Sequence, residues 1–123
     1  MAINFYELDV WKNAYDLLMK IYDVTKGYPR EEIYSLIQQT RRSANSVVAN
    51  IAEAHGRYYY KDKIRVLYIA RGEVTEIQSH LRVALGVGYM ETMSFNSIDL
   101  KYQELYKNLS NYIRYLLTQV NKS

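Results

Sequence analysis

The two histidines of the chain are the residues from which metal binding or acid–base chemistry would start. His80 follows Glu76 by four residues, and His55 follows Glu53 by two. A di-metal carboxylate site in a helical bundle needs Glu and His three residues apart on two helices, plus a glutamate from each of the other two. Neither pair has this spacing, and the chain has no HExxH motif. The sequence therefore predicts no metal and no other cofactor.

Other catalytic patterns are also missing from the sequence. Neither histidine has a nearby Ser or Asp arrangement that resembles part of a nucleophilic triad, and no P-loop occurs. The segment Gly86-Val87-Gly88 is typical of a turn that stops a helix. The chain has no cysteine, which excludes disulfides and thiolate chemistry. We expect a protein that is not an enzyme.

Positive charge and tyrosine alternate in the middle of the chain. The basic residues are Arg57, Lys61, Lys63, Arg65 and Arg71, interleaved with Tyr58, Tyr59, Tyr60 and Tyr68, and Arg41 and Arg42 precede them. Basic side chains neutralise phosphates and tyrosine rings stack on unpaired bases, so this stretch is a candidate contact for RNA or DNA. Two alternatives remain open. The charges can simply solvate a helix face and pair with acids such as Asp62 and Glu73, or the surface can dock a protein.

The composition places most of the excess charge in this region. The chain carries a net charge of +3, and residues 30–71 hold eight Lys or Arg against four Asp or Glu. A local excess of this kind favours an anionic partner more than the total does. Tyrosine accounts for 14 of the 17 aromatic residues. Because a tyrosine covers apolar surface and keeps a hydroxyl for water or a partner, tyrosine-rich helix faces are expected in subunit contacts.

Four segments have the apolar periodicity of helices, at about residues 7–26, 30–55, 60–86 and 92–121. Gly27 suits a left-handed cap at the end of the first, and Pro29 suits the first turn of the second. Short connections between long helices imply antiparallel neighbours. The prediction is one domain over residues 1–123, an all-α, antiparallel up-down-up-down four-helix bundle.

Small residues dominate the middle of the second segment: Ser43, Ala44, Ser46, Ala49, Ala52 and Ala54. They allow a neighbouring helix to approach closely, so the tightest packing of the bundle is expected here. Asn50 and Glu53 are polar groups in this crowded place and need partners. We expect them to have a structural role, hydrogen-bonded or paired with arginines such as Arg42 or Arg71.

The sequence also predicts where the protein works. No apolar run approaches the roughly 18 to 20 residues that span a bilayer. The N-terminal stretch is polar and carries Glu7 and Asp9, so it does not resemble a signal peptide. A cytoplasmic protein without a membrane partner is expected.

Three stretches resemble a known family: FYELDVWKNAYDL, TKGYPREEIYSLIQQTRRSANSVVANIAEAHGR and RVLYIARGEVTEIQSHLRVALGVGY. They are similar to the four-helix bundle protein family, also called the 23S rRNA-intervening-sequence protein family, from about Phe5 to Tyr89. Val48 and Ala54 stand where the family often has proline and glycine, which favours an unbroken second helix. The recurring family positions fall on Trp11, Arg41, Arg42, Asn50, Ile51, Ala52, Glu53, Gly56, Arg57 and Gly72.

The resemblance implies a bacterial protein, often encoded inside an insertion in a large-subunit ribosomal RNA gene. It also implies a barrel-like homopentamer with a positively charged surface. A related protein is the accessory variability protein of diversity-generating retroelements, which associates with a reverse transcriptase and with nucleic acid. These properties are expectations for the present chain.

Together, the residues and the resemblance predict a non-enzymatic homo-oligomer, with a pentamer favoured, that binds RNA or DNA as an accessory protein. The alternative is a scaffold that docks a protein, such as a polymerase-like enzyme, without touching nucleic acid. Phosphate contacts predict an affinity that falls steeply with salt, whereas an apolar dock predicts little change. The residues expected to contact nucleic acid are Arg41, Arg42, Arg57, Lys61, Lys63, Arg65 and Arg71.

Overall fold

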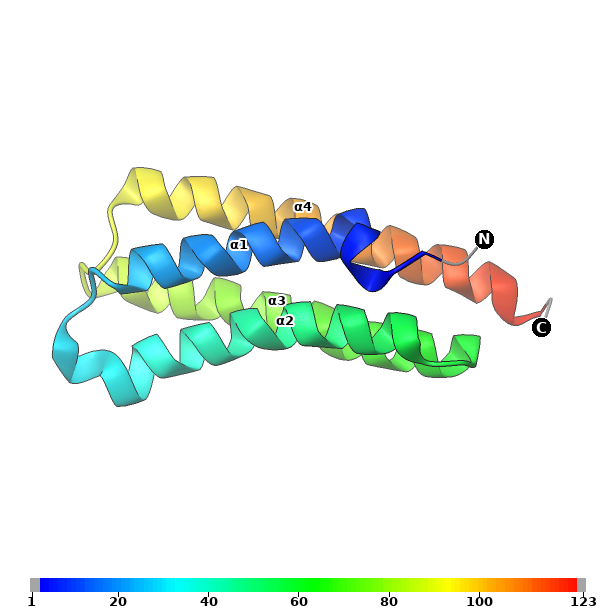
Figure 1. Ribbon diagram of the computed structural model, residues 1–123. Helices are drawn as coiled ribbons and strands as arrows, with labels where there is room; N and C mark the ends of the chain where they lie inside the picture. Colours follow the sequence, from blue (N-terminus) through cyan, green and yellow to red (C-terminus); the bar gives the residue numbers. More distant parts are fainter. Residues whose placement is uncertain (1–2, 122–123) are drawn as a thin grey trace.

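The computed structural model describes residues 3–121, and these residues contain helices and no strand. Neighbouring helices run in opposite directions, with the α2–α3 turn at one end of the bundle and the α1–α2 and α3–α4 connections at the other (Figure 1). This arrangement confirms the predicted up-down-up-down bundle. None of the described helices is both long and apolar enough to cross a membrane. After a 3₁₀ turn at Phe5–Glu7, the α-helices are α1 (Asp9–Thr25), α2 (Gln38–Gly56), α3 (Tyr60–Gly86) and α4 (Thr92–Val120).

The second helix begins later than the sequence predicts. Pro29 has extended backbone angles, a 3₁₀ turn spans Arg30–Glu32, and a π-helical turn spans Ile33–Ile37 before α2 starts. The Glu32 carboxylate stabilises these turns before α2, because it accepts hydrogen bonds from the Leu36 N–H at 3.4 Å and from the Tyr89 hydroxyl at 2.8 Å. Local hydrogen bonding, which apolar periodicity does not encode, therefore decides the start of the helix. From Gln38 to Gly56 the helix is unbroken, as predicted.

A glycine in left-handed conformation ends α3 and not α1. Gly88 has φ +86°, and no other residue in the range 3–121 has a positive φ. The N–H of Tyr89 donates to Ala84 O at 2.9 Å and that of Gly88 to Leu85 O at 3.1 Å, a Schellman pair of bonds. The predicted helix-stopping turn at residues 86–88 is therefore confirmed. The prediction for Gly27 is wrong, since the chain leaves α1 through short-range backbone bonds, including Gly27 N–H to Val24 O.

The most extensive helix contact joins α2 to α3. Ser43, Ala44 and Ala54 of α2 are fully buried, whereas Ala49 is exposed. The prediction of close packing is therefore confirmed for the inner face of α2. A continuous core runs through all four helices, and its most completely buried side chains include Ile21, Val47, Ile51, Leu67, Val74, Ile77, Leu81, Tyr102, Leu105 and Leu109.

One buried carboxylate ties α4 to α3. Asp99 is only 5% exposed and makes a bidentate contact with Arg82, at 2.8 and 3.1 Å. Gln78 and Gln103 also donate to it, at 3.2 and 2.9 Å. The hydrogen bond from Arg82 is the main reason that the pKa of Asp99 lies below its usual range. Nothing in the sequence periodicity distinguished this aspartate from the solvated ones.

Replacing Asp99 by asparagine is expected to lower the free energy of unfolding by about 2 kcal/mol, because a hydrogen-bonded charge pair is lost. The native pair is fully formed above the ordinary Asp pKa of about 3.9, and its contribution disappears as the pH falls through the lower folded value. Urea denaturation from pH 7 to pH 2 measures both effects. A variant with unchanged stability, or with the same acid dependence as the parent, would contradict this role.

Candidate nucleic-acid interface

The seven predicted basic residues do not form one surface. Arg41 and Arg42 lie in the first turns of α2, and Arg57 follows its last residue. A helix of 19 residues is about 28 Å long, so Arg57 is separated from the two arginines by most of the length of α2. Arg71 lies in the middle of α3, two residues before Glu73, which Arg42 contacts. The seven residues are thus spread along two antiparallel helices, and their contact with nucleic acid stays a prediction.

The α2–α3 end, defined as Arg57, Tyr58, Tyr59, Lys61 and Arg65, holds the most accessible part of the predicted set. Tyr58 and Tyr59 are 85% and 65% exposed, and their rings meet edge to face with centroids 4.9 Å apart. Lys61 and Arg65 are one helical turn apart on the exposed face of α3. Within residues 3–121 neither of them lies within ion-pair distance of a carboxylate. Free cations and open tyrosine faces thus occur side by side.

A cavity of about 610 Å³ opens at the same end. It is lined by the three consecutive tyrosines Tyr58, Tyr59 and Tyr60 and by Lys63. Tyrosine rings around an open cavity suit a flat, unsaturated group such as a base, since every base has a face on which a ring can stack. The α2–α3 end therefore combines positive charge with an aromatic cavity that a base could enter.

Two other members of the set are engaged at this end. Arg57 donates to the Glu53 carboxylate at 2.9 Å, and both side chains are partly exposed. Lys63 turns back onto the end of α2, where its ammonium donates to His55 O at 2.8 Å and Ala54 O at 3.4 Å. Partial burial lowers the pKa of Lys63, and the carbonyl end of a helix favours a cation. Lys63 therefore acts as a cap, and Arg57 is a phosphate contact only if it leaves Glu53.

Arg71 is a structural residue. Its guanidinium lies between the rings of Tyr68 and Tyr106, 5.0 and 5.2 Å from their centroids, and donates to Ser110 Oγ at 3.2 Å. The side chain of Arg71 is half-buried, and its contacts with Tyr106 and Ser110 connect α3 to α4. Such stacking makes Arg71 a connection between helices, and its contact with nucleic acid stays an untested prediction.

Arg42 and the two predicted structural polar residues have other partners than expected. Arg42 bridges α2 to α3 through Glu76 at 2.7 Å and Glu73 at 3.4 Å, although more than half of its side chain is exposed. Asn50 donates to Ser46 O and Oγ, both at 2.9 Å. Glu53 pairs with Arg57, as described above. Asn50 is therefore hydrogen-bonded and Glu53 is paired with an arginine, which is Arg57 and neither of the two named as examples, Arg42 and Arg71.

A second basic and aromatic cluster lies at the opposite end of the bundle. Arg41 belongs to it: its Nε donates to Thr25 Oγ1 at 2.9 Å, and its guanidinium lies 4.6 Å from the Tyr22 centroid. Around it is a cavity of about 470 Å³ lined in part by Lys26, Arg30 and Tyr34. The sequence analysis missed this cluster, although the basic residues and tyrosines of Lys26-Gly27-Tyr28-Pro29-Arg30 were a signal for it.

The histidines occupy structural positions. His80 Nε2 lies 3.4 Å from the Glu76 carboxylate, and His55 Nε2 lies 2.6 Å from Ile3 O, which joins the N-terminal segment to the end of α2. Across residues 3–121, no group of three or more His, Cys, Asp or Glu side chains converges to hold a metal ion. The notable surfaces of the described chain are therefore basic and aromatic ones.

Sequence comparison agrees with this bundle. Residues 6–111 match the 23S rRNA-intervening sequence protein family. The chain belongs to that family. The match covers α1, α2, α3 and most of α4, including every residue of the α2–α3 end. Family membership fixes the helical architecture and names no reaction.

A solved structure shows the same architecture in a relative. It is the crystal structure of a protein of unknown function from the S23 ribosomal protein family of Bacteroides thetaiotaomicron, with 26% identity and a TM-score of 0.79. The alignment covers 85% of the present chain and 95% of that chain, so the relative has nearly the same extent. A comparison with curated proteins gives no match.

The variant Arg71→Gln tests the structural assignment of Arg71. It is expected to lower the free energy of unfolding by about 1 to 2 kcal/mol, since two cation–π contacts of about 0.5 to 1 kcal/mol each are lost. At a temperature where the variant remains folded, its affinity for single-stranded RNA should equal that of the parent. Thermal denaturation and fluorescence anisotropy give the two values. Full stability combined with weakened RNA binding would return Arg71 to the contact surface.

Proposed function

We propose that this protein is a non-enzymatic, homo-oligomeric accessory protein that binds single-stranded nucleic acid at the α2–α3 end. The observation that carries the proposal is the combination of Lys61 and Arg65, which have no ion-pair partner within residues 3–121, with the exposed pair Tyr58 and Tyr59. Cations neutralise the backbone while aromatic rings stack on successive bases, and this pairing of features is how proteins hold single strands without sequence preference.

Single strands fit this end better than a duplex does. The tyrosine rings stand at a turn between two helices and line an open cavity, whereas a duplex hides its base faces inside the stack. Recognition of RNA in particular relies on unstacked bases in loops and ends. Arg57 can add a third cation if a phosphate replaces Glu53, because that pair is exposed and a surface ion pair contributes only about 0 to 1 kcal/mol.

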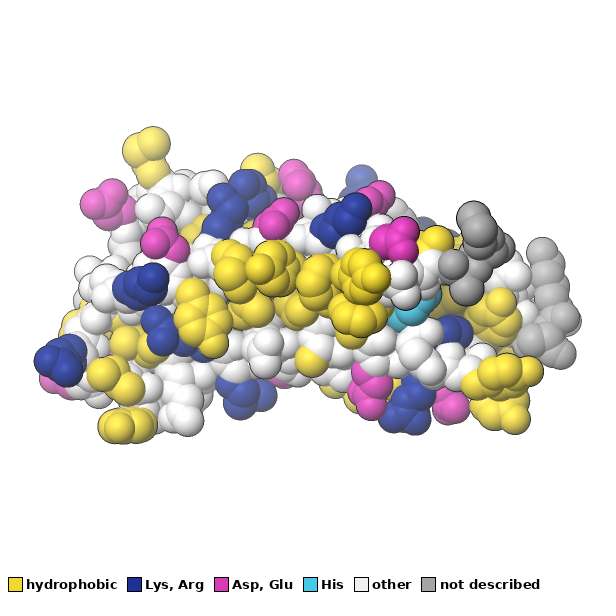
Figure 2. Space-filling view, viewed as in Figure 1, with side chains coloured by type: hydrophobic (Ala, Val, Ile, Leu, Met, Phe, Trp, Pro, Cys, Tyr) yellow, Lys and Arg dark blue, Asp and Glu magenta, His cyan; other side chains and the backbone are white. Residues whose placement is uncertain are grey.

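A homo-oligomer would carry several copies of the α2–α3 end, and this repetition would strengthen the binding of one strand. An aromatic band, defined as Phe5, Trp11, Tyr15 and Tyr22, follows the side of α1 that borders α2, and Figure 2 shows hydrophobic side chains gathered along this face. Trp11 stacks on Tyr15 with centroids 5.2 Å apart and meets Phe5 edge to face at 5.4 Å. Rigid, partly exposed rings of this kind are enriched in protein interfaces.

We infer that the aromatic band contacts a second copy of the chain, with a pentamer as the favoured assembly. The resemblance to ring-forming relatives motivates that subunit number. A ring would place several α2–α3 ends within reach of one strand, and linked sites raise the apparent affinity without any new contact. A cytoplasmic location is part of the same proposal, since ribosomal or messenger RNA would be available there.

The double variant Lys61→Glu/Arg65→Glu tests the binding surface. Single-stranded RNA should bind it at least tenfold more weakly than the parent, and the salt slope of log K should fall by about 1.4, since each phosphate contact contributes about 0.7. Fluorescence anisotropy with a labelled mixed-sequence strand, at several salt concentrations, measures both.

Lys12→Glu/Lys107→Glu is the matched control. It makes the same change of charge at exposed positions of α1 and α4. Equal losses in the two variants would mean that only net charge matters, and an unchanged affinity and slope in the first variant would rule out the α2–α3 end.

The aromatic band is tested by a charge placed within it. Tyr15→Glu is expected to lower the molecular mass in solution, because an ionised carboxylate would be buried without a partner in the subunit contact. The control is Tyr115→Glu on α4, since Tyr115 is 58% exposed and Tyr15 is 42% exposed. Multi-angle light scattering compares them. An equal mass for Tyr15→Glu and the parent would place the subunit contact elsewhere.

A second candidate function is a scaffold that docks a protein, such as a polymerase-like enzyme, without nucleic-acid contact. The exposed tyrosine pair favours it as well, because Tyr58 and Tyr59 are anchors that a protein partner can bury. Binding of RNA that is weak and insensitive to salt would favour this alternative over the first proposal.

A further inference from the structure

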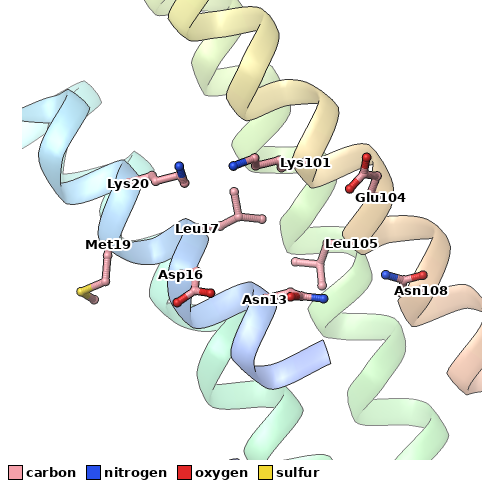
Figure 3. Close-up of a pocket in the computed structure, with 9 residues that line it drawn as sticks. All are labelled: Asn13, Asp16, Leu17, Met19, Lys20, Lys101, Glu104, Leu105 and Asn108. Carbon is pink, nitrogen blue, oxygen red and sulfur yellow. The ribbon is translucent and has the colours of Figure 1, made fainter. Parts of the chain in front are cut away.

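A groove lies between α1 and α4, apart from the α2–α3 end. Its cavity has a volume of about 480 Å³, within the range of sites for small ligands. Figure 3 shows that side chains from both helices point into it. The lining residues are Asn13, Asp16, Leu17, Met19, Lys20, Lys101, Glu104, Leu105 and Asn108.

Two lysines face each other across one end of the groove. The ammonium groups of Lys20 on α1 and Lys101 on α4 point toward one another (Figure 3). Direct approach of the Lys20 amine, and then its positive charge, lowers the pKa of Lys101. Carboxylates are available one turn away on the same helices, at Asp16 and Glu104, yet within residues 3–121 neither lysine forms an ion pair. A converging pair of cations is a binding geometry for an anionic group.

The other end of the groove offers hydrogen bonding and an apolar floor. Because α1 and α4 run in opposite directions, Asn13 and Asn108 also face the groove as a pair, each seven residues from the lysine of its helix. Seven residues correspond to about 10 Å along a helix. Between the two ends lie the buried side chains of Leu17 and Leu105. The groove thus presents cations, an apolar surface and amides in that order.

We propose that the α1–α4 groove binds one ribonucleoside monophosphate unit, with its phosphate between Lys20 and Lys101. The base would lie over Leu17 and Leu105, with its polar edge toward the amides of Asn13 and Asn108. Asparagine amides both donate and accept hydrogen bonds, which is the pattern that a base edge requires. The unit can be a free nucleotide or one nucleotide of a single strand, since both present the same chemistry.

The two carboxylates narrow the class of ligand. Asp16 and Glu104 line the groove beside the lysines, so the four charged groups together have no net charge. A single phosphate can contact the lysines, whereas a triphosphate would bring further negative charge against the carboxylates. The same carboxylates can accept hydrogen bonds from ribose hydroxyls, so a ribonucleotide is expected to bind more tightly than its deoxy form.

This inference does not rest on strand binding at the α2–α3 end. The groove is formed by α1 and α4, and that end by α2 and α3, so variants of one leave the other intact. Loss of binding at Lys61 and Arg65 and loss at Lys20 and Lys101 are therefore separate results.

The test is isothermal titration of the full chain with each of the four ribonucleoside 5′-monophosphates, and with adenosine, ribose 5-phosphate and inorganic phosphate. At least one monophosphate should bind tenfold more tightly than any of these three partial ligands. The variant Lys20→Gln/Lys101→Gln should lose at least tenfold in affinity. Lys12→Gln/Lys107→Gln, which makes the same change on the same two helices outside the groove, should bind like the parent.

Thermal denaturation shows whether a loss of affinity in the variant comes from a loss of folding. Removing two mutually repelling charges should leave the melting temperature of Lys20→Gln/Lys101→Gln equal to or above that of the parent, and the monophosphate should raise only the parent's value. A short single-stranded RNA, titrated in parallel, distinguishes the source of the unit: binding of either ligand that depends on the lysine pair supports the site. The proposal is overturned if monophosphate binding survives in the variant, or if no monophosphate binds and RNA binding is absent or is unchanged in the variant.

Discussion

The packing of α2 against α3 determines which side chains of the two helices can reach one another. The small side chains on the inner face of α2, among them Ser43 and Ala44, are fully buried, and α2 makes its most extensive helix contact with α3. Because the two helices lie so close, Arg42 reaches the carboxylates of Glu73 and Glu76, and Lys63 reaches the last carbonyls of α2. Tyr58 and Tyr59 lie in the short connection between these two helices and are largely exposed.

The cations of the chain divide into those that hold helices together and those left to solvent. Arg82, Arg71 and Arg42 each connect two helices through a carboxylate, a hydroxyl or aromatic rings. Lys61 and Arg65 make no such connection within the described residues, and for that reason they carry the functional proposal. A guanidinium already held between rings must leave them to reach a phosphate, whereas an exposed cation can neutralise a phosphate directly and release the counterions of the nucleic acid. Local net charge was therefore a poor guide to the number of available contacts.

Apolar periodicity was sufficient to predict the four helices and their antiparallel order, because burying one face of each helix determines both. Features that depend on one specific hydrogen bond were not predictable in this way. The carboxylate of Glu32 sets the start of the second helix, and the left-handed glycine is at Gly88 and not at Gly27. The basic residues of the candidate site were all recognised, but their distribution over the surface required the helix register. The Lys20–Lys101 pair joins residues 81 positions apart, so no sequence window could contain it.

The central claim is that a homo-oligomer of this bundle binds single-stranded nucleic acid through charge and stacking. Light-scattering mass of the purified protein, alone and with mixed-sequence single-stranded RNA at low and at moderate salt, tests it most directly. We expect a mass of several chains, with five favoured, that rises with RNA at low salt and returns to its original value at moderate salt. A monomeric mass, or an oligomeric mass that RNA does not change at either salt concentration, would contradict it.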